Sequence, residues 1–102
     1  MKIETDTTAD ESLVTVEGDV DLYSSPKLRK AVLEAVKKSV TGAGVHLGAV
    51  SYMDSSGVAT LVEGLRSAKE HGKTFVLIAP SPAVSKVLEL ARLDSIFEVR
   101  AA

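Results

Sequence analysis

The sequence predicts an α/β fold with a small, mostly parallel or mixed β-sheet and about three helices. Segments with strand character alternate with amphipathic helical segments in the order ββαβαβαβ. One apolar run, residues 74–78, is uninterrupted, as expected for a strand covered on both faces. No linker or internal repeat divides the chain, so we expect one domain over residues 1–102.

The first two predicted strands are close enough in sequence to form an antiparallel hairpin. Residues 2–7 alternate weakly between polar and apolar side chains, and residues 9–11 are typical of a turn. In residues 13–18 the alternation places Val14 and Val16 on one side.

A first helix is predicted from Ser24-Ser25-Pro26 to about Lys38, with a serine hydroxyl as its cap and proline at its first position. Its apolar side chains follow helical spacing: Leu28, Ala31, Val32, Ala35 and Val36. Residues 41–44, Thr-Gly-Ala-Gly, are predicted to be a loop, and residues 45–47 a short strand.

Residues 51–58 lead into a second helix, which ends at Gly72. Its apolar positions are Val58, Leu61, Val62, Leu65 and Ala68. Residues 74–78 form the next strand. Ser81-Pro82 begins a third helix, whose stripe consists of Val84, Val87, Leu88 and Ala91. Residues 96–99 are predicted to be the last strand.

Composition excludes several kinds of protein. The chain has no cysteine, which excludes disulfides, thiolate metal sites and a cysteine nucleophile. A net charge of −2 argues against a protein that works on nucleic acid, which needs a basic face. No signal-like start and no membrane-length apolar run occur, so we expect a cytoplasmic protein that does not insert into membranes.

The stretch Asp54-Ser55-Ser56-Gly57 joins a strand to a helix and allows three interpretations. Asp54 or Ser55 could cap the helix. Ser55 could be a nucleophile, or it could accept a phosphoryl group. Gly57 and Gly64 lie two turns apart and suggest close approach, either to the sheet or to a partner.

A serine hydrolase is disfavoured because no base is well placed. His71 lies sixteen residues after Ser55 on the same predicted helix, roughly 24 Å along its axis. His46, alone on a strand, is more often a surface residue. Gly42-Ala-Gly44 precedes a strand instead of opening a helix, which argues against a nucleotide loop. The pair Asp19 and Asp21 has no metal-ligand spacing. We therefore expect no catalytic residues, cofactor or metal.

A hydroxyl at a helix N-terminus is well suited to receive a phosphoryl group. The added charge, about −1.5 to −2, meets the positive end of the helix dipole and unpaired N–H groups. Phosphorylation there would leave the fold intact and change the surface that a partner contacts.

Residues 50–58, Val-Ser-Tyr-Met-Asp-Ser-Ser-Gly-Val, resemble the signature of STAS domains, and above all of bacterial anti-sigma factor antagonists. The resemblance extends to residues 16–21, to residues 81–84 and to residues 93–97. His46 is a departure, because the family commonly has Asp or Asn there.

This resemblance implies a partner-switching module without enzymatic activity. The serine phosphorylated in that family corresponds to Ser55, with Ser56 as the second choice. The unphosphorylated form binds an anti-sigma factor that is itself a serine kinase, and a serine phosphatase resets the switch. The partner-binding residues it implies are Asp21, Asp54, Ser55, Ser56, Gly57 and Val58.

A second hypothesis is a STAS accessory subunit of a lipid-transporting ABC system. In that case the protein docks by its second helix onto the permease or ATPase, and Ser55 caps the helix without being modified.

Overall fold

The computed structural model describes residues 1–101, and its strands and helices alternate in the predicted order. The elements are β1 (Lys2–Thr7), β2 (Glu11–Val20), α1 (Ser25–Lys38), β3 (Gly42–Met53), α2 (Ser55–Glu70), β4 (Thr74–Ile78), α3 (Pro82–Leu90) and β5 (Glu98–Arg100). The predicted α/β fold with three helices is confirmed.

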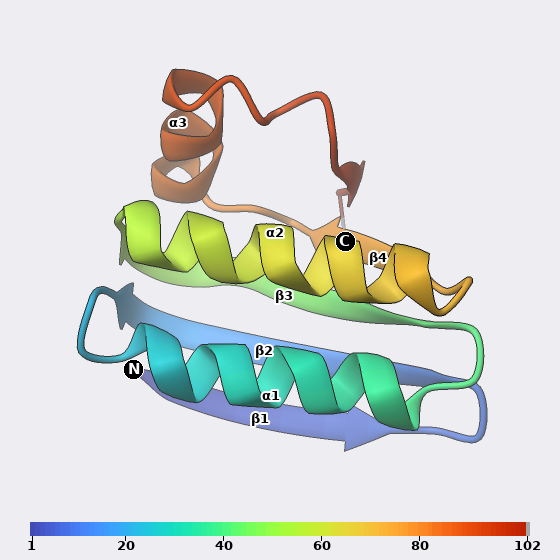
Figure 1. Cartoon of the computed structure of the whole chain (residues 1–102). Coiled ribbons are helices and arrows are strands. Elements are labelled where there is room, and N and C mark those ends of the chain that lie inside the picture. Colours follow the sequence, from blue (N-terminus) through green and yellow to red (C-terminus); the bar gives the residue numbers. More distant parts are fainter. Residues whose placement is uncertain (102) are drawn as a thin grey trace.

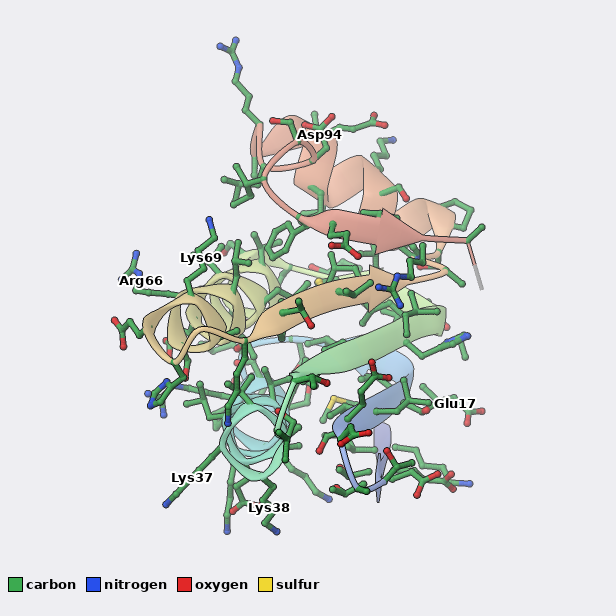
Figure 2. All side chains as sticks on the ribbon, turned by 90° about the vertical axis from the view of Figure 1, so that its right-hand side faces the viewer. Glu17, Lys37, Lys38, Arg66, Lys69 and Asp94 are labelled. Carbon is green, nitrogen blue, oxygen red and sulfur yellow. The ribbon has the colours of Figure 1, made fainter. Side chains whose placement is uncertain are left out.

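The five strands form one mixed sheet in the order β1-β2-β3-β4-β5. β1 and β2 pair antiparallel, as the predicted hairpin requires, whereas β2, β3, β4 and β5 pair in parallel. Helices α1 and α2 lie side by side over one face of the sheet (Figure 1). Helix α3 packs against β3 and the neighbouring α2. The opposite face of the sheet carries neither α1 nor α2, and we call it the helix-free face (Figure 2).

One hydrophobic core lies between the sheet and the helices. Strand alternation sends every second side chain of β2 inward, so Val14 and Val16 are fully buried. The largest fully buried side chains are leucines of α1, β3, α2 and β4: Leu28, Leu47, Leu61 and Leu77. The helical stripes and strand patterns of the sequence therefore identify most of the core. The exception is Ala91, which was predicted in the stripe of the third helix but is the exposed C-cap of α3.

The prediction of a loop at residues 41–44 and a short strand at residues 45–47 is wrong. β3 runs from Gly42 to Met53, and its glycines are strand residues paired with β2 and β4. A β-carbon on Gly42 would lie 2.0 Å from Thr74 Oγ1 and 2.5 Å from the Thr74 carbonyl oxygen. Glycine is needed here for close packing of neighbouring strands, and not for a turn.

Two other boundaries differ from the predictions. β2 extends two residues beyond residues 13–18 at each end, and β5 is only Glu98–Arg100. Phe97, predicted in the last strand, lies before it. Its ring instead packs against Phe75, with centroids 6.4 Å apart, and it is buried. Burial of this ring in the core explains the apolar signal at that position.

No helix within residues 1–101 is long and apolar enough to cross a membrane.

Two glycines let α2 approach its neighbours closely. A β-carbon on Gly57 would lie 2.7 Å from Met53 Cγ and 2.9 Å from Val20 Cγ1, both at the sheet. On Gly64 it would lie 2.6 Å from Val32 Cγ1 of α1 and 2.7 Å from Phe75 Cζ of β4. The sequence left open whether these glycines allow close approach to the sheet or to a partner. Both allow close packing inside the protein.

We predict that Gly64→Ala destabilises the fold although alanine is the better helix former. Overpacking a buried site costs about 1–3 kcal/mol, and the gain in helix propensity returns about 1 kcal/mol. Because the β-carbon would lie under 3.0 Å from both Val32 and Phe75, the overpacking cost falls in the upper part of this range. The free energy of unfolding, measured in urea, should therefore fall by about 1–2 kcal/mol. Ser67→Ala, in the same helix but only half-buried, is the matched control and should not destabilise. An unchanged Gly64→Ala midpoint would contradict the close packing.

Candidate functional site

The candidate site forms where two parallel strands end side by side. Val20, the last residue of β2, pairs with Met53, the last residue of β3. The residues that follow them, Asp21 and Asp54, therefore emerge at the same edge of the sheet. The Asp54 backbone N–H donates to the Val20 carbonyl oxygen over 3.1 Å, which ties the two loops together.

Asp54 is the N-cap of α2, one of the roles considered for it in the sequence. Its backbone is extended, with φ −102° and ψ −173°, and its Oδ1 accepts a hydrogen bond of 2.9 Å from the Ser56 N–H. The Asp54 carbonyl oxygen accepts from the N–H groups of Gly57 and Val58. The carboxylate thus satisfies one of the N–H groups that the first turn of a helix leaves free.

The two serines after the cap differ in environment. Ser56 is half-buried, and its hydroxyl donates to Asp54 Oδ1. Ser55 is the first residue of α2 and is exposed, and its hydroxyl has no hydrogen-bond partner within the described residues. Only the Ser55 hydroxyl is therefore both free and accessible from solvent.

The loop that begins with Asp21 is held by that carboxylate. Asp21 Oδ1 accepts from the backbone N–H groups of Tyr23 and Ser24, each over 3.0 Å. The Ser24 hydroxyl accepts from the Asp21 N–H over 2.9 Å. The prediction that a serine hydroxyl caps α1 is therefore wrong for Ser24, because that hydroxyl faces back toward Asp21 and makes no cap hydrogen bond to the helix. The result is a short, well-fixed connection between β2 and α1.

Both carboxyl groups are more acidic than usual. Hydrogen bonding to Ser24, chiefly to its backbone N–H, lowers the pKa of Asp21, and the nearby negative charge of Asp54 opposes this slightly. The Ser56 hydroxyl, followed by backbone N–H groups, lowers the pKa of Asp54. Two carboxylates are therefore held charged beside each other at neutral pH.

The structure brings together Asp21, Asp54, Ser55 and Ser56, which the sequence singled out. Gly57 and Val58, predicted to be partner-binding residues, are buried. They lie beneath the surface and support it by packing against the sheet.

Three large exposed side chains near these residues were missed in the sequence. Tyr23 is 91% exposed, Leu22 is 68% exposed and Tyr52 is 51% exposed. Tyr52 pairs with Asp19 one step before the strand ends. The sequence could have predicted this exposure. In Asp21-Leu22-Tyr23-Ser24 the aliphatic and aromatic residues lie beside turn residues and belong to no helical or strand pattern of buried positions. Because Met53 points into the core, its neighbour Tyr52 points to the helix-free face. We call Leu22 and Tyr23 the apolar rim of the site.

Neither histidine can serve Ser55 as a base. The His46 ring accepts from the Gly48 N–H over 3.3 Å, within β3. The His71 ring contacts the Ser67 carbonyl oxygen over 2.7 Å at the far end of α2. Among the described residues, no three histidine or acidic side chains form a group that could hold a metal ion. The arrangement offers an exposed hydroxyl beside two carboxylates and exposed apolar side chains.

Comparison with known proteins identifies the family of the chain and supports its fold. Residues 3–99 match the family model described as "Mlab, STAS domain". An anti-sigma-B factor antagonist of Listeria monocytogenes is 31% identical over 88 residues, which cover 85% of this chain and 76% of the relative. Another, of Staphylococcus epidermidis, is 27% identical over 99 residues, which cover 97% of this chain and 92% of the relative.

Solved structures share the architecture. The anti-sigma factor antagonist SpoIIAA in its unphosphorylated form superposes with a TM-score of 0.83 at 23% identity, covering 99% of this chain and 89% of that one. The phosphorylated form of Bacillus SpoIIAA superposes with a TM-score of 0.77 at 22% identity, covering 99% and 92%. At this identity the likeness shows the fold.

The lowered pKa values of Asp21 and Asp54 predict how acid affects stability. A carboxyl group whose pKa is lower in the folded state stabilises the fold above its ordinary value of 3.8, and this contribution is lost as the pH falls through the folded value. Between about pH 5 and about pH 3 the urea midpoint should therefore fall more steeply for the wild type than for Asp21→Asn/Asp54→Asn, since asparagine still caps a helix.

The control for this measurement is Glu17→Gln/Asp94→Asn, which removes two exposed charges outside the site. It should retain the wild-type slope with pH. Equal slopes for the wild type and the Asp21→Asn/Asp54→Asn variant would contradict the assignment.

Proposed function

This chain belongs to the STAS domain family, and we propose that it is an anti-sigma factor antagonist that works by partner switching. In its unphosphorylated form it binds an anti-sigma factor that is also a serine kinase, and phosphorylation of Ser55 releases it. A serine phosphatase restores the binding form. Two curated relatives, matched over most of this chain, are anti-sigma-B factor antagonists, which supports the class of function.

The observation that carries the proposal is the free hydroxyl of Ser55. A kinase must reach the acceptor oxygen, and Ser55 is exposed at the first position of α2. The Ser56 hydroxyl is already donated to Asp54 and is half-buried, which favours Ser55 as the acceptor. The chain supplies no base, so the kinase provides the nucleotide and the catalytic groups.

A phosphoryl group on Ser55 changes the charge of the surface and leaves the fold intact. It adds about −1.5 to −2 at pH 7. The N-terminus of α2 favours this negative charge, whereas Asp21 and Asp54 already place two carboxylates there. The doubled negative charge disfavours any partner that holds a nucleotide phosphate or a carboxylate opposite this point.

The apolar rim gives the proposed partner its binding energy. Tyr and Leu side chains with polar surroundings are typical of interface centres, and Tyr is among the residues that contribute most when truncated. The backbone at Tyr23 is already fixed because its N–H donates to Asp21, so little conformational entropy of this loop is lost on binding. The carboxylates of Asp21 and Asp54 orient a partner whose basic groups face them while its nucleotide phosphate or a carboxylate faces Ser55.

We predict that incubation with the cognate kinase and ATP places one phosphate on Ser55, located by mass spectrometry. Ser56→Ala should still be phosphorylated, and Ser55→Ala should not. Ser55→Asp should bind the kinase at least about tenfold more weakly than Ser55→Ala, which corresponds to about 1.4 kcal/mol. Phosphate on another residue, or equal binding by both variants, would contradict the switch.

The alternative function, an accessory subunit of a lipid-transporting ABC system, rests on the outer side of α2. Half-buried Val62 and Leu65 line a shallow hollow there with Arg66, Lys69 and Glu70. This hollow lies along the helix, away from the Ser55 end, and could receive a permease or ATPase. The two functions therefore use different parts of the same helix.

Two sets of variants separate these functions. Because Tyr23 is 91% exposed, Tyr23→Ser should leave the unfolding midpoint unchanged and weaken kinase binding about tenfold or more. Arg66→Glu/Lys69→Glu, at exposed positions of α2, should leave kinase binding within about twofold. Calorimetric titration with the purified kinase measures both. Loss of kinase binding by the α2 variant alone would contradict docking at the Ser55 surface. Co-purification of a permease or ATPase that is lost only from the α2 variant would favour the ABC subunit.

A further inference from the structure

The helix-free face of the sheet contains a groove that the proposed function does not use. Its floor is β3, where Gly42 and Gly44 alternate with the buried residues Ala43 and Val45 and so carry no side chain on this face. Beside Gly44, Leu13 is paired in β2 and Val76 in β4. The groove has a volume of about 270 Å³, and no residue of a helix lines it.

The part of the groove beside Gly44 is apolar, and its lining includes Leu13, Val76 and Ile78. A β-carbon on Gly44 would lie 2.8 Å from Ile78 Cδ1 and 3.6 Å from Leu13 Cδ1. Leu13 is 36% exposed, although it is a leucine in the middle of a sheet. The aliphatic side chains of Leu13 and Ile78 therefore lie on either side of the Gly44 backbone in the groove.

One end of the groove is acidic. Asp6 of β1 and Glu11 of β2 line it, and no cation pairs with either of them within the described residues. Arg100 lines the other side but is paired with Glu98 over 3.1 Å. Elsewhere on this face Glu17 is also unpaired, while Lys2 pairs with Glu4 over 3.7 Å. The face thus keeps unpaired negative charge next to the apolar floor.

The N-terminal hairpin and α1 also differ in charge. Residues 1–21 carry seven acidic side chains and one lysine, whereas α1 carries five basic side chains and one acidic. Figure 2 shows Lys37, Lys38, Arg66 and Lys69 on the helix side and Glu17 on the opposite side. A ligand attracted to the helix-free face must therefore be cationic.

The size of the groove limits what can occupy it. Pockets for cofactors and drug-sized ligands usually have about 300–1,000 Å³, so about 270 Å³ is sufficient only for one or two aliphatic side chains. From these observations we propose that the groove binds a short extended segment of a partner protein, in which an aliphatic side chain packs against Leu13 and Ile78 beside Gly44 and a lysine or arginine two residues away, on the same face of the segment, pairs with Asp6 and Glu11.

The groove is independent of the Ser55 surface. Gly44 and Met53 are nine residues apart on β3, which corresponds to about 30 Å along an extended strand. The groove is also on the opposite face from α1 and α2. A partner can therefore occupy the groove whether or not Ser55 is phosphorylated, and this inference does not depend on the proposed function.

The test uses the ¹⁵N-labelled full chain and two synthetic peptides, acetyl-Lys-Ser-Leu-Ser-Lys-amide, whose lysines share a face with its leucine when extended, and its counterpart with glutamate in place of lysine. Only the lysine peptide should shift the backbone amide signals of Leu13, Gly44, Val76 and Ile78. Gly44→Val fills the groove with a residue that suits a strand, and it should weaken binding at least about tenfold. Ser55→Asp should leave binding unchanged.

The charge contribution is tested with two matched double variants. Asp6→Asn/Glu11→Gln should weaken binding of the lysine peptide roughly fourfold or more, since each exposed ion pair contributes a few-fold. Glu17→Gln/Asp94→Asn changes the net charge equally but away from the groove and should stay within about twofold. The proposal is overturned if the lysine peptide shifts none of the groove signals, if both peptides bind equally, or if the two double variants behave alike. Shifts that depend on protein concentration without peptide would assign the face to a second copy, which also overturns it.

Discussion

The parallel pairing of β2 with β3 is the interaction on which the site depends. Because two parallel neighbours end at the same edge, the pairing of Val20 with Met53 places Asp21 and Asp54 next to each other. The hydrogen bond from the Asp54 N–H to the Val20 carbonyl oxygen fixes this arrangement. The caps, the exposed Ser55 and the apolar rim all follow from the meeting of these two strand ends.

Much of the fold was predictable from the sequence because its signals are local. Helical stripes such as Leu61, Leu65 and Ala68 follow from side-chain spacing, and Ser81 caps α3 as predicted, accepting from the Val84 N–H over 3.3 Å. The errors concern residues whose role depends on distant parts of the chain. Gly42 suggested a turn, but glycine is needed there because the backbone of Thr74 approaches closely. Thr74 lies thirty-two positions further on, so local sequence patterns could not predict this contact.

The site shows the same division. Asp54 as a cap and Ser55 at the start of a helix are visible in the motif itself. That Ser56 is bound to Asp54 while Ser55 is free depends on side-chain geometry, and that Tyr23 is exposed depends on how Asp21 shapes its loop. Gly57 was predicted to bind a partner, but it packs closely against Met53 and Val20 inside the protein. Local chemistry could be predicted, but the surface it forms could not.

The distance in sequence between the two halves of the site has a consequence for recognition during synthesis. Asp21 and Ser55 are separated by the whole of α1 and β3, and they meet only after the non-local β2–β3 pairing has formed. Such pairings form late compared with helices and hairpins, because a long loop must close first. A nascent or unfolded chain therefore displays the Ser55 motif without its other half. A partner that contacts both loops distinguishes the finished protein from its folding intermediates, and the fold itself acts as a checkpoint before binding.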